Sequence, residues 1–197
     1  MFERWSVKIT DILEKQGIIQ SNSREVYEYG LRQLFMSLLN IVTMLLIGAA
    51  MGMIVQTIIF TVSYIPLRSY AGGYHASSPK RCWAVSAIML FGNLFFLRLF
   101  PKKFYVYLTI LSLIAGIFII FLSPVDDANK QLDAKEISVY KLRTILTISI
   151  ELTILIFLFV KKIWQITIVF EAVWITMLIM LVVGKIKNDI VIKKGKK

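Results

Sequence analysis

Hydrophobic residues in this sequence form long runs, and polar residues are confined to short segments between them. No charged residue occurs from Leu34 to Leu67. A transmembrane helix needs about 20 apolar residues, so this stretch can hold two spans. The remaining runs are each long enough for one. The pattern predicts an all-α, polytopic integral membrane protein with about six transmembrane helices, over Gly30–Ala49, Met51–Pro66, Cys82–Leu97, Phe104–Ser123, Ile145–Val160 and Ile163–Gly184.

The N-terminal residues have a different pattern. Phe2, Trp5, Ile9 and Leu13 recur at helical spacing with charged residues between them. This predicts an amphipathic helix that lies on the membrane surface or packs on other cytoplasmic segments. The chain is therefore expected to be one domain in three parts. These are an amphipathic segment (1–29), transmembrane helices with a polar loop at 68–82 (30–184), and a basic tail (185–197).

Composition supports a membrane protein and excludes other classes. Hydrophobic residues make up 57% of the chain and charged residues 18%, against about 45–50% and about 25% in soluble domains. The net charge is +11, but the basic residues flank apolar runs. This placement favours contact with an anionic phospholipid membrane and not with nucleic acid.

The basic residues also predict an orientation. If the N-terminus is cytoplasmic, 18 of the 23 basic residues lie on the cytoplasmic side. The positive-inside rule then places both termini and the loops at 68–81 and 124–142 in the cytoplasm. The five basic residues expected outside are Arg98, Lys102, Lys103, Lys161 and Lys162.

The candidate chemistry is concentrated in the loop from Arg68 to Cys82. It contains the only histidine, His75, and the only cysteine of the chain. A cysteine beside a histidine base is a typical acyl-transfer nucleophile. One cysteine and one histidine cannot form a disulfide or a structural metal site, and no phosphate-binding glycine motif is present. We therefore expect no cofactor and no metal.

Residues seven apart on one helix are about 10 Å apart along its axis, so a break is needed for the histidine and cysteine to meet. Ser78-Pro79 is typical of an N-cap followed by the first helical residue. This places Cys82 in the first turn of a span, with His75 in the preceding loop. The Gly72-Gly73 pair allows that loop to fold back over the helix start.

The surroundings of Cys82 favour the thiolate. A helix N-terminus stabilises negative charge, Lys80 and Arg81 are adjacent, and no acidic residue occurs between Glu28 and Asp126. Backbone N–H groups near Gly72, Gly73 or the helix start are candidate oxyanion donors.

Acidic residues elsewhere have less direct roles. A third catalytic group, Asp126 or Asp127, could reach the cysteine only through the fold. Two further acids, Glu151 and Glu171, fall within predicted spans. At that depth they are more readily explained by structural pairing than by catalysis.

The motif Arg68-Ser-Tyr-Ala-Gly-Gly-Tyr-His75 followed by Cys82 resembles the accessory gene regulator B (AgrB) family, which are membrane cysteine endopeptidases of Gram-positive quorum sensing. The resemblance extends over nearly the whole chain, including the Ser123–Lys130 loop. It implies that Cys82 is the nucleophile and His75 its general base, with Arg68 and Gly73 supporting the site. It also implies an AgrD-type precursor peptide as substrate, a cyclic thiolactone as product, and a homodimer.

Two other classes of function remain open from the sequence. The first is a peptide transporter or export channel without proteolytic activity, which predicts that Cys82→Ser retains function. The second is a non-enzymatic membrane scaffold, which predicts indifference to both His75→Ala and Cys82→Ser.

Overall fold

The computed structural model describes residues 2–74, 76, 78–125 and 132–195. Within these residues the chain is helical and contains no strand, only one isolated bridge between Gly72 and Val125. The all-α prediction is therefore confirmed. The elements are α1 (Phe2–Lys15), η1 (Ser21–Ser23), α2 (Arg24–Ala50), α3 (Ile54–Ala71), α4 (Pro79–Leu99), η2 (Lys102–Phe104), α5 (Tyr105–Leu122), α6 (Ala134–Val160) and α7 (Trp164–Gly195).

Among the described residues, five helical segments are long and apolar enough to cross a membrane, one fewer than the six predicted spans. They are Ser21–Ala50, Pro79–Leu99, Lys102–Leu122, Ala134–Val160 and Trp164–Ile190. The remaining predicted span corresponds to α3. This helix has 18 residues, which are mostly apolar but include Gln56 and Arg68. These helices agree with the prediction of a multi-pass membrane protein.

Several boundaries differ from the prediction. The second predicted span stops at Pro66, yet α3 continues to Ala71, although a proline inside a helix removes one backbone hydrogen bond. The predicted start at Ile145 is too late, because Asp133 and Glu136 form a capping box that begins α6 at Ala134. The basic tail is likewise helical as far as Gly195.

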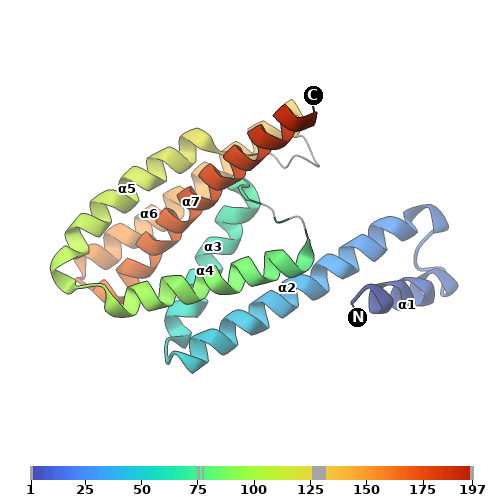
Figure 1. Ribbon diagram of the computed structural model, residues 1–197, viewed down its shortest axis with the longest axis horizontal. Coiled ribbons are helices and arrows are strands. Elements are labelled where there is room, and N and C mark those ends of the chain that lie inside the picture. Colours follow the sequence, from blue (N-terminus) through green and yellow to red (C-terminus); the bar gives the residue numbers. More distant parts are fainter. Residues whose placement is uncertain (1, 75, 77, 126–131, 196–197) are drawn as a thin grey trace.

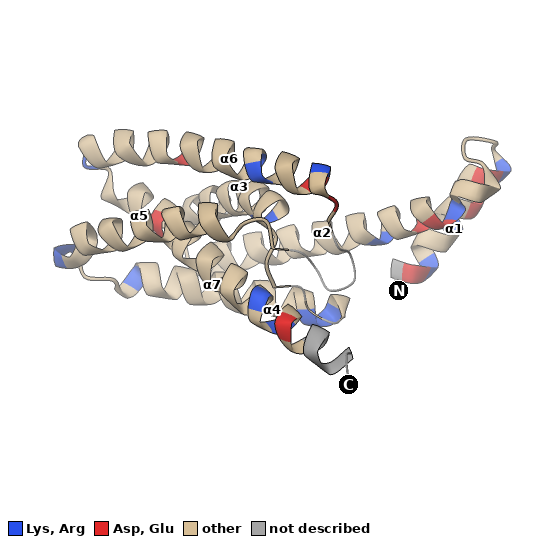
Figure 2. Ribbon diagram, turned by 90° about the horizontal axis from the view of Figure 1, so that it is seen from above, with Lys and Arg blue, Asp and Glu red and all other residues tan. Residues whose placement is uncertain are grey.

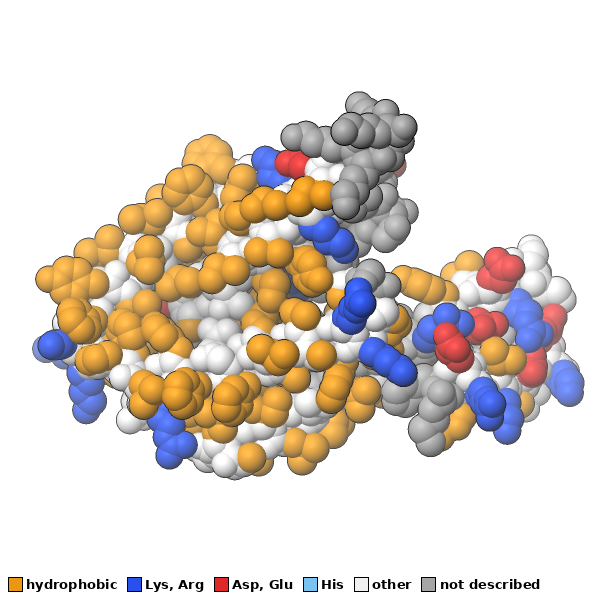
Figure 3. Space-filling model, in the orientation of Figure 1, with side chains coloured by type: hydrophobic (Ala, Val, Ile, Leu, Met, Phe, Trp, Pro, Cys, Tyr) orange, Lys and Arg blue, Asp and Glu red, His pale blue; other side chains and the backbone are white. Residues whose placement is uncertain are grey.

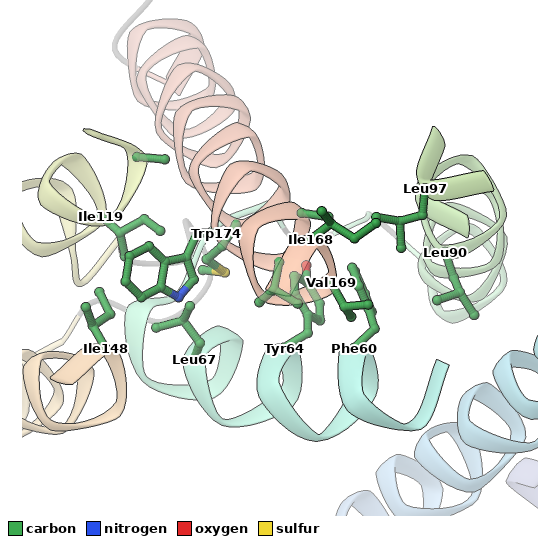
Figure 4. Packing of buried hydrophobic residues seen from close by; sticks show 14 of the residues in the cluster. Phe60, Tyr64, Leu67, Leu90, Leu97, Ile119, Ile148, Ile168, Val169 and Trp174 are labelled. Atoms are coloured by element: carbon green, nitrogen blue, oxygen red, sulfur yellow. The ribbon is translucent and has the colours of Figure 1, made fainter. Parts of the chain in front are cut away.

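Helix α7 lies at the centre of the bundle, between α3, α5 and α6 (Figure 1). In the most apolar stretch of α7, 61% of the residues are buried, against 17% in the corresponding stretch of α4. Trp174 on α7 packs among Leu67, Ile119 and Ile148 from three other helices (Figure 4). It also packs on Gly116 of α5, where a Cβ would lie 2.7 Å from the indole ring.

The two acidic residues within the spans are buried and hydrogen-bonded. The indole Nε1 of Trp174 donates to Glu151 at 2.6 Å. The hydroxyl of Thr109 donates to one oxygen of Glu171, and the other oxygen, Oε2, is buried with no hydrogen-bond partner among the described residues. These bonds join α7 to α6 and to α5, which agrees with a structural role for both acids.

Loops lie at two opposite ends of the bundle, and most charged residues lie there too (Figure 2). The connections after α4 and α6 are at one end, and those after α3 and α5 are at the other, near the C-terminus (Figure 1). The predicted inner and outer loops are thus separated in space. Which end faces the cytoplasm stays a prediction.

Helix α1 folds back along α2 as a hairpin that projects from the bundle (Figure 1). Its buried face is small and polar, formed by Ser6 and Thr10. Arg24 of α2 bonds to Asp11, and to Glu14 at 2.7 Å. The α1 helix is therefore packed on α2, while the apolar side chains of Trp5 and Ile12 stay exposed, as a membrane-surface helix also requires.

Candidate active site

Helix α4 begins as the sequence predicts. Ser78 has an extended backbone, and its Oγ accepts a hydrogen bond from the Arg81 N–H at 3.3 Å. Pro79 occupies the first helical position. The Cys82 N–H donates to the Ser78 carbonyl at 3.0 Å, which closes the first turn. Cys82 thus lies in the first turn of α4, with an exposed thiol side chain.

A cavity of about 260 Å³ lies beside Cys82. Arg68 and Gly72, two of the predicted site residues, line it together with Cys82. Gln33 of α2, Tyr64 and Ser69 of α3 and Ser86 of α4 add further polar groups, and Met180 of α7 also lines the cavity. Four segments that are separated in the sequence therefore meet around the single thiol.

Gly72 fixes the start of the α3–α4 loop. Its φ of +78° is a conformation that side chains rarely adopt, and a Cβ there would lie 2.1 Å from the Val125 carbonyl oxygen. The Val125 N–H donates to the Ala71 carbonyl at 2.9 Å. Glycine is required here because two backbone segments touch.

The next residues of the loop run against α7. The Tyr74 N–H donates to the Met180 carbonyl at 2.8 Å. At Gly73, whose φ is +118°, a Cβ would lie 3.0 Å from the same oxygen. Facing them on α7 is Gly184, where a Cβ would lie 2.4 Å from the Gly73 carbonyl carbon. The central helix therefore holds the loop through glycine-to-glycine contact.

Arg68 holds the loop from the other side. Its guanidinium Nη2 donates to the Tyr74 carbonyl within the loop. The loop backbone is thus clamped by an arginine at the end of α3 and by a carbonyl of α7. Arg68 is a positioning residue in this structure, and it also lines the cavity beside Cys82.

His75 lies outside the described residues, as do Asp126 and Asp127. The residues on either side of His75, Tyr74 and Ala76, both line the cavity that contains Cys82. The predicted pairing of His75 with Cys82 and the choice of a third group therefore stay predictions.

Lys80 and Arg81 do not line the Cys82 cavity. Lys80 lines a separate cleft on the other side of α4, and the backbone N–H of Arg81 is used in the Ser78 cap. The structure also narrows the choice of oxyanion donors. The N–H of Gly72 donates to the Arg68 carbonyl at 3.2 Å, so neither it nor the Cys82 N–H is free.

Two residues of this region were missed from the sequence. Gln33 reaches the cavity from α2, and its amide is a neutral hydrogen-bond donor. It is a polar interruption in an apolar run, but nothing in the sequence pairs it with a loop 40 positions away. Gly184 gives no sequence signal either, because it stands at the end of the predicted sixth span, where a glycine is ordinary.

Within the described part of the chain, no group of three or more His, Cys, Asp or Glu side chains is placed to hold a metal ion. The polar side chains that line the Cys82 cavity carry a thiol, a guanidinium, two phenols, an amide and two serine hydroxyls.

Comparisons with protein families and with curated proteins identify the same family. The profile of the family described as accessory gene regulator B matches residues 6–183. A putative AgrB-like protein 2 of Clostridium perfringens strain 13 is 27% identical over 142 residues, or 69% of this chain and 66% of that protein. A putative AgrB-like protein of strain SM101 matches with the same identity and coverage. The match thus spans slightly less than two thirds of these relatives. No solved structure matches significantly.

Proposed function

Because the chain belongs to the accessory gene regulator B family, we propose that it is a membrane cysteine endopeptidase that converts an AgrD-type precursor peptide into a cyclic thiolactone. Family membership supports a part in accessory gene regulator quorum sensing. The observation that carries the proposal is the exposed Cys82 thiol at a helix start, in a cavity shared with Arg68 and Gly72.

In the first step the Cys82 thiolate attacks the carbonyl carbon of the peptide bond at the end of the signal segment. A C–S bond forms and the carbonyl oxygen becomes an oxyanion. His75 takes the thiol proton and delivers it to the leaving amine as the C–N bond breaks. The C-terminal tail is released, and the signal segment stays on the enzyme as a thioester.

In the second step a thiol of the precursor itself attacks the thioester. One C–S bond forms as another breaks, so the ring closes and the Cys82 thiol is regenerated. This exchange succeeds only where water is kept from the thioester. A small cavity at the end of a membrane bundle is suited to that requirement.

The oxyanion needs a donor near the Cys82 sulfur. Because the N–H groups of Gly72 and Cys82 are engaged and Gly73 lies against α7, side chains are the better candidates. Arg68 and Gln33 both line the cavity and both carry N–H donors. We assign Arg68 to loop positioning and Gln33 to oxyanion stabilisation.

The test uses the full chain in lipid vesicles with a synthetic precursor, and products are identified by mass. The wild type should release the tail and form a product lighter than the linear signal segment by one water. Cys82→Ser and His75→Ala should lose both products, while Lys102→Gln, at the opposite end of the bundle, should keep them. The export hypothesis would replace this one if neither protein cut the precursor and Cys82→Ser moved it across the membrane as fast as the wild type did. The homodimer implied by the family stays a prediction.

A further inference from the structure

A second, larger hollow lies on the other side of the first turn of α4. It has a volume of about 600 Å³ and separates the α1–α2 hairpin from the start of α4. Met36, Leu39 and Trp83 form an apolar wall, while Glu3, Arg32 and Lys80 supply charges. Figure 3 shows basic side chains at this end of the bundle, beside the hairpin. We call this hollow the hairpin cleft.

The hairpin cleft and the Cys82 cavity are neighbours. Lys80 and Trp83 face the cleft, whereas Cys82 and Ser86 face the cavity, so the first turns of α4 separate the two. Helix α2 lines both, with Arg32 in the cleft and the adjacent Gln33 in the cavity. A helix with its side chains is about 10–12 Å across, and an extended chain advances about 3.3 Å per residue. A peptide whose reacting bond lies at Cys82 would therefore reach the cleft within a few residues.

The charges of the cleft are arranged to accept a carboxylate. Arg32 Nη2 donates to Glu28 of the same helix at 3.2 Å, and Nη1 lies 3.5 Å from an oxygen of Glu3, whose side chain is 75% exposed. Exposed pairs of this kind contribute little. The Nε of Arg32 is buried and, among the described residues, has no hydrogen-bond partner. Lys80 adds a second positive charge from α4.

We propose that the hairpin cleft binds a part of the peptide substrate a few residues from the reacting bond, where an apolar side chain stands beside a carboxylate. The apolar side chain packs on Trp83, Met36 and Leu39. The carboxylate binds Arg32 and displaces Glu3, which competes for the same guanidinium from α1. This inference rests on the proposed function, since it names how the substrate of the same site is recognised.

The binding test uses Cys82→Ala protein in nanodiscs of neutral phosphatidylcholine, so that neither cleavage nor anionic lipid affects the result. The probes are two fluorescein-labelled peptides with alternating Leu and Glu or alternating Leu and Gln. The Glu peptide should bind about tenfold more tightly than the Gln peptide, as expected for a charge-assisted hydrogen bond. On this background Arg32→Gln should remove the preference, Arg32→Lys should restore part of it, and Glu3→Gln should strengthen it several-fold.

Lys102→Gln, which removes a positive charge at the other end of the bundle, is the matched control and should leave the preference intact. Equal binding of the two peptides, or a preference that survives Arg32→Gln in a folded protein, would overturn the inference. Failure of the two proposals can be told apart. Cleavage that needs Cys82 while binding ignores Arg32 refutes only the cleft, whereas cleavage without Cys82 refutes the enzyme mechanism.

Discussion

The α7 core and the start of α4 are packed very differently, although both build the Cys82 cavity. In the most apolar stretch of α7, 61% of the residues are buried, and this helix contacts α3, α4, α5 and α6. The corresponding shares are 17% for α4 and 11% for α2. The half that carries the thiol is thus loosely enclosed, with the hairpin cleft on one side and the Cys82 cavity on the other.

The difference assigns separate tasks to the two regions. The core holds the α3–α4 loop by backbone contacts, since Tyr74 donates to Met180 and Gly73 lies against Gly184. The loose side leaves room for an extended peptide. Reactive groups need placement to within about 0.5 Å, whereas a peptide needs space to enter. We therefore expect catalysis to be sensitive to small changes in the core and tolerant of them in α4.

The largest expected effect comes from Gly184→Ala. The added methyl group would lie 2.4 Å from the Gly73 carbonyl carbon and 2.5 Å from the Tyr74 nitrogen, so the loop must move away from α7. Cleavage of the precursor should fall roughly 10- to 100-fold, because misplacement by about 1 Å has that cost. Gly92→Ala is the control. A Cβ added at Gly92 would have no atom within 4 Å other than its chain neighbours and its own helix backbone. Equal activity of the two variants would show that α7 does not position the loop.

A smaller effect, on stability alone, is expected from Trp174→Phe. It removes the buried hydrogen bond to Glu151 and leaves that carboxyl without a donor. The free energy of unfolding in detergent should drop by about 1–3 kcal/mol. Activity of the folded fraction should be retained, because Glu151 does not line the Cys82 cavity. Loss of activity at unchanged stability would instead indicate a functional role for the acid.

Trp83→Phe tests the loose side of the comparison. The Trp83 indole donates to Thr43 of α2 at 2.9 Å, and this bond is exposed. Its removal should lower the free energy of unfolding by less than about 1 kcal/mol. Thermal unfolding of Trp83→Phe and Trp174→Phe in the same detergent makes the comparison direct. A loss at Trp83 as large as that at Trp174 would mean that α4 is packed as firmly as the core.

The smallest effect concerns pH at the α1–α2 hairpin. Hydrogen bonds from the Ser21 hydroxyl and then from the Arg24 guanidinium lower the pKa of Glu14 below its ordinary value of 4.5. A carboxylate with a lowered pKa stabilises the fold above its unfolded pKa, and that contribution is lost as pH falls through the folded value. Spin labels on α1 and α2, on a Cys82→Ser background, should therefore stay close at neutral pH and separate below about pH 4. Glu14→Gln should weaken this transition, because Asp11 is then the one carboxylate that still pairs with Arg24 across the two helices.

Much of this architecture can be predicted from the sequence, because membrane spans and caps are local signals. The Ser78-Pro79 cap placed Cys82 in the first turn of α4, as the structure confirms. The predicted end of α3 at Pro66 was wrong for a physical reason. Proline predicts a helix end, but in α3 the surrounding bundle supports the helix for one further turn beyond Pro66.

The remainder depends on contacts between distant segments. The sequence predicts that Gly72 allows the loop to fold back. The packing of the helices decides that Gly72 contacts Val125 and that Gly73 contacts Gly184. Gln33 reaches the cavity because α2 crosses the start of α4. The separation of Lys80 from the Cys82 cavity has a local origin instead. Residues two positions apart on a helix point about 200° apart, so Lys80 and Cys82 face different hollows.

The central claim, that Cys82 carries the signal segment as a thioester, is tested most directly by the mass of the intact enzyme. Wild-type protein in vesicles is incubated with a precursor that lacks its ring-closing thiol, so that the intermediate accumulates. We predict a mass increase equal to the signal segment, mapped to Cys82 and removed by hydroxylamine, together with release of the tail. Cys82→Ala should show neither. Undiminished tail release by Cys82→Ala would contradict the account.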